Sequence, residues 1–186
     1  TSTQLIVVDN CSTDSTSIHI RENLDLIDKL IVEPDNGQSS AINKALPYVE
    51  GRYVNWINTD DRISEDALEL IVSAFDTSPW ADILIGKCRK VYPQQNNLSV
   101  TRSTTLGLEQ LLPYSLLFGQ IIQPSTFWRT PVFMEYMPLR EDLHFIMDHA
   151  LLLHYLLENG SSGLAYTEEV LSTAILHDHC KSMKLS

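Results

Sequence analysis

The chain has 186 residues, and 24 Asp and Glu against 13 Lys and Arg give a formal net charge of −11 and an isoelectric point near 4.8. This length suits one domain that buries roughly two-thirds of the surface of its unfolded chain. A nucleic-acid partner is excluded, because phosphate contacts need clustered Lys and Arg. No run approaches the roughly 18 apolar residues of a transmembrane helix, and the amino terminus lacks the basic and apolar pattern of a signal peptide.

The cysteines are three in number, Cys11, Cys88 and Cys180, and they are spread over the whole chain. No Cys-x-x-Cys spacing points to zinc or dithiol chemistry, so reduced intracellular thiols are the default. We therefore expect a cytoplasmic protein, and a peripheral position at the inner face of a membrane stays open.

Short apolar runs alternate with helix signals in the first half of the chain. Strands are expected at residues 5–9, 30–33, 53–57 and 83–92, and helices at residues 15–23, 39–46 and 65–78. Strands that alternate with helices of this length indicate the α/β class and a parallel, doubly wound sheet. A polar turn region at 93–97 separates this half (1–92) from the rest (93–186) within one expected domain, and a further helix is expected at 106–112.

The most informative chemical feature is the pair Asp60-Asp61. The apolar run 54–57 leads into these adjacent carboxylates, and a helix signal follows at residue 65. We expect the strand to end at the pair, and in open α/β sheets ligands bind at that edge. Mg²⁺ and Mn²⁺ are commonly held by one or two carboxylates plus substrate phosphates. A solvated turn, where Asp is favoured, is the alternative interpretation.

Two further segments place polar residues at corresponding points. The apolar run 5–8 is closed by Asp9, and a loop rich in Ser, Thr and Asp leads to a helix near Ser15. The apolar run 30–32 precedes a turn at Gly37, just before a helix. Backbone N–H groups exposed at such a helix start can face an anionic group.

Together these segments resemble the inverting glycosyltransferases of the large family 2 type. The matching motifs are Asp9-x-x-Ser12-x-Asp14, Gly37-x-x-x-Ala41-x-Asn43 and the DXD-like Asn58-x-Asp60-Asp61. Three motifs in this order make a specific signal. The resemblance implies the GT-A fold of nucleotide-diphospho-sugar transferases, a Rossmann-like three-layer α/β sandwich.

The resemblance also implies roles for individual residues. Asp9 would contact the nucleotide base, and Asp60 and Asp61 would handle ribose and a divalent metal, Mn or Mg. The remaining residues expected to shape the nucleotide-sugar pocket are Ser12, Asp14, Asn36, Gly37 and Asn43. Asn58 replaces an acid often found there, which would reduce metal affinity.

The segment 139–153 resembles the part of the family in which an acidic residue opens a helix beneath the acceptor. By that match Asp148 is the catalytic base, which takes the proton of the acceptor hydroxyl during inverting transfer. Family members often carry a second acid where this chain has Ala150. Glu141 and Asp142 are competing candidates, and a simple N-cap is the structural alternative for Asp148.

Two other stretches resemble family segments on the acceptor side. Residues 120–129 resemble the acceptor-side strand, where Phe127 and Trp128 either pack in the core or stack on a sugar ring. Residues 170–182 resemble the closing strand, and by that match His177 completes the metal site, with His179 two residues further along.

The family normally begins with a strand, a loop and a helix ahead of the segment that starts this chain. We therefore expect a GT-A domain that lacks its first strand and helix, and with them part of the nucleotide-base pocket on which activity depends. The missing strand would lie between the strands at residues 5–9 and 53–57.

The function expected from these residues is metal-dependent, inverting transfer of a sugar from a nucleoside-diphosphate donor in polysaccharide biosynthesis. The acceptor would be a carbohydrate or a lipid-linked molecule, and a homo-oligomer stays open. One alternative is a non-catalytic remnant or nucleotide-binding module. Another is a response-regulator-like domain that is phosphorylated at a strand-end acid such as Asp9, for which a suitably placed Lys is missing.

Overall fold

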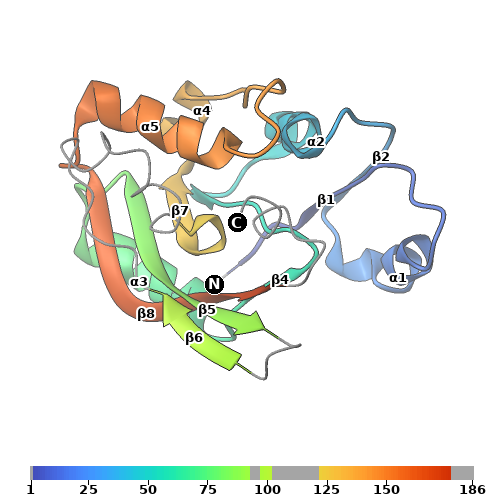
Figure 1. The fold of residues 1–186 in the computed structure, drawn as a ribbon, viewed down its shortest axis with the longest axis horizontal. Helices are drawn as coiled ribbons and strands as arrows, with labels where there is room; N and C mark the ends of the chain where they lie inside the picture. Colours follow the sequence, from blue (N-terminus) through green and yellow to red (C-terminus); the bar gives the residue numbers. More distant parts are fainter. Residues whose placement is uncertain (1, 93–96, 102–121, 177–186) are drawn as a thin grey trace.

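The computed structural model describes residues 2–92, 97–101 and 122–176 (Figure 1). The first part of the chain forms a parallel pair of strands, β1 (Ile6–Asp9) and β2 (Lys29–Val32), joined by helix α1 (Thr16–Glu22). Helix α2 (Gln38–Ala45) follows β2 and contacts β1. These elements lie together at one side of the molecule in Figure 1. The strands and helices expected in this region are therefore present, within a residue or two of their predicted ends.

A larger sheet of six strands carries the rest of the fold. Its strands are β3 (Tyr53–Val54), β4 (Asp61–Ile63), β5 (Ile83–Tyr92), β6 (Asn97–Thr101), β7 (Thr126–Arg129) and β8 (Leu164–Ile175). Their order is β3-β7-β5-β8-β4, and β6 pairs with β5. Among the described residues β1 pairs only with β2, and β3 only with β7.

Parallel pairing is less extensive than the alternating pattern predicted. Only β1–β2 and β5–β8 are parallel, and the remaining described pairs are antiparallel. The larger sheet is therefore mixed, because β3 pairs antiparallel with β7 and β4 with β8, and both pairs join distant parts of the chain.

Helices cover both faces of the larger sheet. Helix α3 (Ala67–Thr77) packs on one face, and α4 (Thr130–Glu135) and α5 (Met147–Asn159) pack on the other (Figure 1). Side chains alternate along a strand, so Ile83 and Ile85 of β5 join the core under α5 while Leu84 joins the core under α3. Trp128 and Phe127 of β7 divide between the two cores in the same way, and both are buried, as the core-packing interpretation predicted.

Arg129, the last residue of β7, links the sheet to the segment that follows α3. Its Nε donates a hydrogen bond to Ala81 O, and its Nη2 lies 3.4 Å from Ser78 O and 3.3 Å from Pro79 O, just after α3 ends. The guanidinium also lies 5.0 Å from the centre of the Phe75 ring, a cation–π distance. This arginine therefore connects β7 to the segment just after α3, where Ser78 O also accepts the backbone N–H of Ala81.

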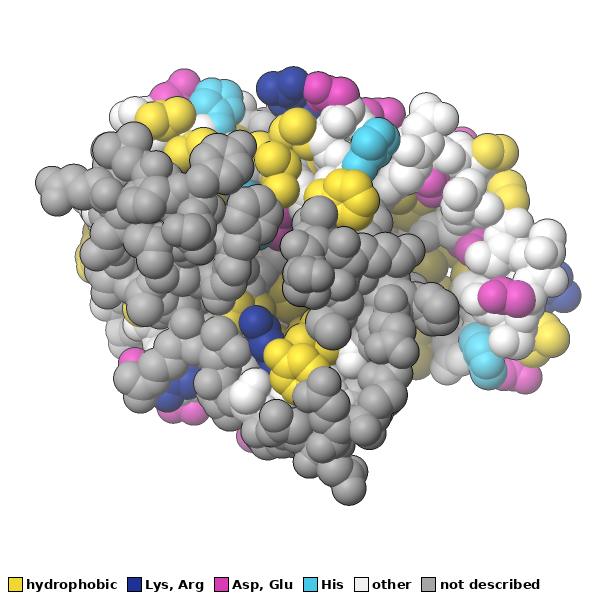
Figure 2. Space-filling view, in the orientation of Figure 1, with side chains coloured by type: hydrophobic (Ala, Val, Ile, Leu, Met, Phe, Trp, Pro, Cys, Tyr) yellow, Lys and Arg dark blue, Asp and Glu magenta, His cyan; other side chains and the backbone are white. Residues whose placement is uncertain are grey.

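The acidic side chains are dispersed on the face of the molecule drawn in Figure 2. There the Asp and Glu side chains of the described residues are scattered and form no single broad patch. Ordinary surface charge is therefore a sufficient explanation for the low isoelectric point. No helix in the described part of the chain is both long enough and apolar enough to cross a bilayer.

Candidate functional site

Asp9 ends β1 and is only 7% exposed. Ser12 donates to it twice, from its backbone N–H to Oδ2 at 3.0 Å and from its hydroxyl to Oδ1. Between them Cys11 has a φ of 54°, in the left-handed region. The motif Asp-x-x-Ser thus closes a tight loop at the end of the strand. This loop is the one predicted to meet the nucleotide base.

The two predicted nucleotide loops lie against each other. The side-chain oxygen of Asn10 accepts a hydrogen bond of 2.9 Å from the backbone N–H of Asp35. Asp14 lies further along the first loop, where Oδ1 accepts the backbone N–H of Thr16 at the start of α1. The hydrogen bonds from Thr16 lower the pKa of the Asp14 carboxyl. Asp14 is therefore held as an ionised group just before α1, whose N-cap residue is Ser15.

A small pocket opens at the start of α2. Its lining combines residues of the predicted nucleotide loop with residues from the segment before α5, namely Asn36, Gly37, Gln38, Ser39, Glu141 and His144. Gly37 has a φ of 119°, which residues with a Cβ rarely adopt, and its N–H donates to Asp35 Oδ1 at 2.8 Å. The N-cap residue is Gly37, so no N-cap side chain covers the start of α2 at this pocket.

Asn43 connects α2 to the segment that precedes α5. Its Nδ2 donates to Leu139 O at 2.9 Å, and its Oδ1 accepts from Leu139 N at 2.8 Å. Nδ2 also lies 3.4 Å from Glu141 Oε1. In this structure the predicted pocket residue Asn43 therefore joins the nucleotide side of the fold to the acceptor side.

The strand before the acidic pair is shorter than expected. β3 ends at Val54, Asp60 lies in a turn, and Asp61 is the first residue of β4, opposite Ala174 of β8. The prediction that a strand ends at the two carboxylates was therefore wrong. The strand stops early because the side chain of Asn55 bonds to the backbone, with its Oδ1 accepting the N–H of Trp56 at 2.8 Å.

Asp61 is held in an unfavourable electrostatic position. Burial raises the pKa of its carboxyl from 3.8 to about 6, and the neighbouring charge of Asp60 adds to the increase. Asn58 donates a hydrogen bond of 3.3 Å to Asp61 Oδ2, which partly offsets it, and Asn58 in turn accepts from Gln38 at the α2 pocket. A carboxylate with such a penalty on ionisation, next to a second carboxylate, fits a cation.

The donor set for that cation is small. Within residues 2–92, 97–101 and 122–176, no three His, Cys, Asp or Glu side chains come together as a metal site. Asp60 and Asp61 alone suit an ion such as Mg²⁺, which commonly takes one or two carboxylates, with water and substrate phosphates as its other ligands. The predicted third ligand, His177, lies outside the described residues.

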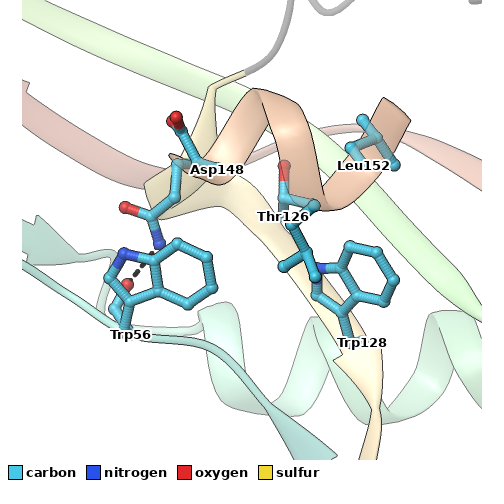
Figure 3. A pocket seen from close by; sticks show the side chains of 7 residues that line it. Trp56, Thr126, Trp128, Asp148 and Leu152 are labelled. Atoms are coloured by element: carbon cyan, nitrogen blue, oxygen red, sulfur yellow. Dashed lines mark hydrogen bonds between the residues drawn. The ribbon is translucent and has the colours of Figure 1, made fainter. Parts of the chain in front are cut away.

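Asp148 is the second residue of α5, and the N-cap position belongs to Ile146. Asp148 Oδ1 accepts the backbone N–H of His149 at 2.9 Å and lies 3.0 Å from His149 Nδ1. The side chain is 21% exposed. It lines a pocket together with Trp56, Gln123, Thr126, Trp128, Leu151 and Leu152 (Figure 3). An acid that opens the helix, predicted from the sequence, is thus found at the wall of a pocket.

The competing acids lie in less suitable places. Asp142 is paired with Arg140 at the surface, and hydrogen bonds from that guanidinium lower the pKa of its carboxyl. A carboxylate held in this way is a weaker base. Glu141 belongs to the α2 pocket, near Asn43. Asp148 is therefore the best placed of the three.

Sequence reasoning did not single out Trp56, Gln123 or His149. Gln123 lies in a short turn, Gln123–Ser125, ahead of β7, and Trp56 lies beyond the end of β3. Two signals were readable in advance: His149 adjoins Asp148 in the chain, and the family's acceptor-side strand commonly has a Gln before Phe and Arg, as in residues 120–129. The contact between Trp56 and Gln123 spans 67 positions, so only the fold reveals it.

Comparison with known proteins identifies the class. Residues 2–150 match Glycosyl transferase family 2, and the chain belongs to this family. It is 40% identical over 70 residues to TuaG of Bacillus subtilis (strain 168), named as a teichuronic acid biosynthesis glycosyltransferase, a match covering 36% of this chain and 27% of TuaG. It is 37% identical over 76 residues to the minor teichoic acid biosynthesis protein GgaB of the same organism, covering 39% of this chain and 8% of GgaB. The matches span well under two-thirds of either relative.

Solved structures show the same fold. S. aureus TarS (residues 1–349) in complex with UDP matches with a TM-score of 0.72 at 21% identity, over 94% of this chain and 52% of that one. The mannosyltransferase PcManGT of Pyrobaculum calidifontis, in complex with GDP-Man and Mn²⁺, matches with a TM-score of 0.63 at 17% identity, over 95% and 48%. The expected GT-A fold is thus confirmed.

Proposed function

We propose that this protein transfers a sugar from a nucleoside diphosphate to an acceptor hydroxyl with inversion at the anomeric carbon. The observation that carries the proposal is Asp148, a partly exposed carboxylate at the wall of a pocket at the start of α5. In a single displacement one carboxylate takes the proton of the attacking hydroxyl, and Asp148 is suitably placed to do so. Asp148 Oδ1 accepts the backbone N–H of His149 and lies near His149 Nδ1. No hydrogen bond to Asp148 Oδ2 is found among the described residues.

The nucleotide-sugar donor would bind along the two loops that follow β1 and β2. Asp9 would accept from the base, and the loop that Ser12 closes would fit against it. Asp14, Asn36, Gly37 and the helix start of α2 would line the remainder of the nucleotide-sugar pocket. Helix N-termini favour anionic groups, so the start of α2 suits a diphosphate or a polar sugar substituent.

Asp60 and Asp61 would hold a divalent cation, Mn or Mg, with Asp60 also reaching the ribose. Such an ion stabilises the charge of a departing diphosphate. For Asp61 the ion would relieve the electrostatic penalty that raises its pKa to about 6. Asn58 in place of an acid leaves the site with fewer carboxylates, so binding of the nucleotide and of the ion should depend strongly on each other.

Names of related proteins support the donor and acceptor classes. Solved structures with this fold contain UDP-GlcNAc in S. aureus TarS and Mg²⁺ with uridine diphosphate in the glucosyl-3-phosphoglycerate synthase of Mycobacterium tuberculosis. TuaG and GgaB are named for teichuronic and teichoic acid biosynthesis. We therefore propose a carbohydrate or lipid-linked acceptor and a role in polysaccharide synthesis, and a lipid-linked acceptor would bring the protein to the inner membrane face.

A nucleotide-binding module without catalysis is the second candidate. It is favoured by Asn58, which leaves the DXD-like motif one acid short. The experiment that separates the two is the release of sugar from UDP-glucose, UDP-GlcNAc and GDP-mannose in Mn²⁺, followed by proton NMR. These donors are α-linked, so inversion to water gives the β-anomer first. An initial α-anomer contradicts the mechanism, and nucleotide binding without release from any donor supports the module.

A further inference from the structure

The chain contains two Asn-Gly pairs, Asn36-Gly37 and Asn159-Gly160. This dipeptide is chemically labile, because glycine has no Cβ to hinder attack by its own backbone nitrogen on the side-chain amide of the preceding asparagine. The attack closes a succinimide ring and expels ammonia. In a folded protein the reaction therefore depends on how firmly the structure holds the asparagine amide and the glycine nitrogen.

The pair Asn159-Gly160 is held firmly at the end of α5. Asn159 is the last residue of the helix, and its Nδ2 donates to Tyr155 O at 3.1 Å and to the hydroxyl oxygen of Tyr136. Gly160 N donates to Leu156 O at 2.9 Å and so belongs to the hydrogen-bond ladder of the helix. Ring closure here requires both side-chain bonds to break and the last turn of α5 to open.

The pair Asn36-Gly37 is held much less firmly, in the loop between β2 and α2. The Asn36 side chain is exposed and makes no hydrogen bond with any other described residue. Gly37 N donates to Asp35 Oδ1 at 2.8 Å, so its partner is an aspartate side chain two residues earlier in the same loop. Rotation of the Asp35 side chain alone releases this nitrogen, whereas release of Gly160 N requires the end of a helix to unwind.

We propose that Asn36 is a site of spontaneous deamidation, and that its product weakens nucleotide binding at the start of α2. The Gly37 nitrogen loses its proton to hydroxide and bonds to Asn36 Cγ, the bond from Cγ to Nδ2 breaks, and the amide nitrogen leaves as ammonia. Water then opens the succinimide at either carbonyl, which gives aspartate or isoaspartate at position 36. The reaction needs water alone, with no oxidant and no second protein.

The position of Asn36 gives the modification its consequence. Asn36 lines the pocket at the start of α2, which already contains the acid Glu141. A new carboxylate adds negative charge where the proposed function places an anionic diphosphate, and like charges repel. Isoaspartate also lengthens the backbone by one carbon just before the turn at Gly37. The effect on binding therefore rests on the proposed transferase function, whereas the deamidation itself does not.

Incubation of the full chain at pH 8, followed by peptide mass spectrometry, measures both Asn-Gly pairs in one sample. In the folded protein Asn36 should deamidate at least about tenfold faster than Asn159, as expected where two hydrogen bonds must first open. In concentrated urea the two pairs should react at similar rates, because the fold then protects neither. Similar rates in the folded protein, a slower reaction at Asn36, or a product without isoaspartate would overturn the proposed site, since direct hydrolysis of the side-chain amide gives aspartate alone.

Calorimetry with UDP tests the effect on binding. The deamidated fraction, separated by anion exchange, should bind UDP at least about threefold more weakly than the unreacted protein. Asn36→Asp should reproduce the part of this loss that comes from charge, and Asn159→Asp is the matched control that should bind as the wild type. Equal affinity of the two fractions would overturn the effect on binding. A protein that binds no UDP before incubation would contradict the transferase proposal and the binding effect with it, while the mass measurement still decides the site of deamidation.

Discussion

Asn43 and Leu139 exchange a pair of hydrogen bonds across 96 positions of the chain, at 2.9 and 2.8 Å. Asn43 belongs to α2, beside the predicted nucleotide pocket, and Leu139 begins the segment that leads to Asp148. This contact is therefore a fixed connection between the donor half and the acceptor half of the fold. Its two bonds set where the segment before α5 begins.

Removal of this connection should destabilise the protein. Asn43→Ala is expected to lower the free energy of unfolding by about 2 kcal/mol, since two hydrogen bonds are lost and two backbone groups are left unpaired. Urea denaturation measures the change. Asn23→Ala is the matched control, because Asn23 Nδ2 makes one exposed local bond, to His19 O. An equal decrease in the free energy of unfolding in both variants would show that the Asn43–Leu139 contact contributes no more than an exposed local hydrogen bond.

Arg129 should not be replaceable by lysine. Its guanidinium donates to Ala81 O and lies near Ser78 O and Pro79 O, just after α3. The single ammonium group of lysine cannot reach all three carbonyl oxygens at once. Arg129→Lys is expected to lower the free energy of unfolding by about 2 kcal/mol in urea denaturation. Arg140→Lys, at the exposed pair with Asp142, should change it little. Similar melting of both variants would contradict the role given to Arg129.

Asp61 should destabilise the metal-free protein above neutral pH. Its folded pKa of about 6 lies above the usual 3.8, so the folded state favours the protonated form. Stability from this group is complete below about pH 4 and is lost as the pH rises through 6. Asp61→Asn should therefore raise the free energy of unfolding at pH 8 by roughly 1–2 kcal/mol, less than the full shift implies because solvent screens the partly exposed carboxyl.

Urea denaturation in EDTA at pH 4 and pH 8 measures this difference. The advantage of Asp61→Asn should disappear at pH 4, where Asp61 is protonated in the native protein. A gain that is the same at both pH values would mean that burial and the charge of Asp60 do not control this carboxyl.

Asp148→Asn should remove general-base catalysis and leave nucleotide binding intact. Loss of general-base catalysis is expected to reduce sugar transfer roughly 10²- to 10⁴-fold, while nucleotide binding stays unchanged. Steady-state kinetics with the active donor, together with calorimetry of nucleotide binding, measures both. Glu141→Gln and Asp142→Asn are the comparisons, and both should retain most of the activity. If Asp148→Asn transfers sugar at the wild-type rate, Asp148 has only a structural role at the helix start.

The sequence was sufficient for features that depend on local rules. Asp9 at the end of a short apolar strand and Gly37 at a turn before a helix lie where the patterns predicted, and Asp148 lies in the first turn of a helix, as the family resemblance implied. Local capping, turn and periodicity preferences decide these positions.

Features that depend on distant contacts were beyond the sequence. The apolar run 53–57 reads as one strand, but Asn55 bonds to Pro124 and Gln123 and the ladder stops at Val54. Asp61 therefore begins β4 opposite β8, a pairing over more than 100 positions that no local pattern reports. Tertiary contacts also place Gln123 beside Trp56, and so define the pocket at Asp148.

Calorimetric titration with uridine diphosphate is the most direct test of a cation-assisted nucleotide site at Asp60 and Asp61. Binding should require Mn²⁺ or Mg²⁺, should weaken at least about tenfold in excess EDTA, and should lose that dependence in Asp60→Asn, as expected when a carboxylate ligand is removed. Asp25→Asn, which removes an exposed acid elsewhere, should behave as the wild type. Equal binding of the nucleotide in Mn²⁺ and in chelator would contradict the account.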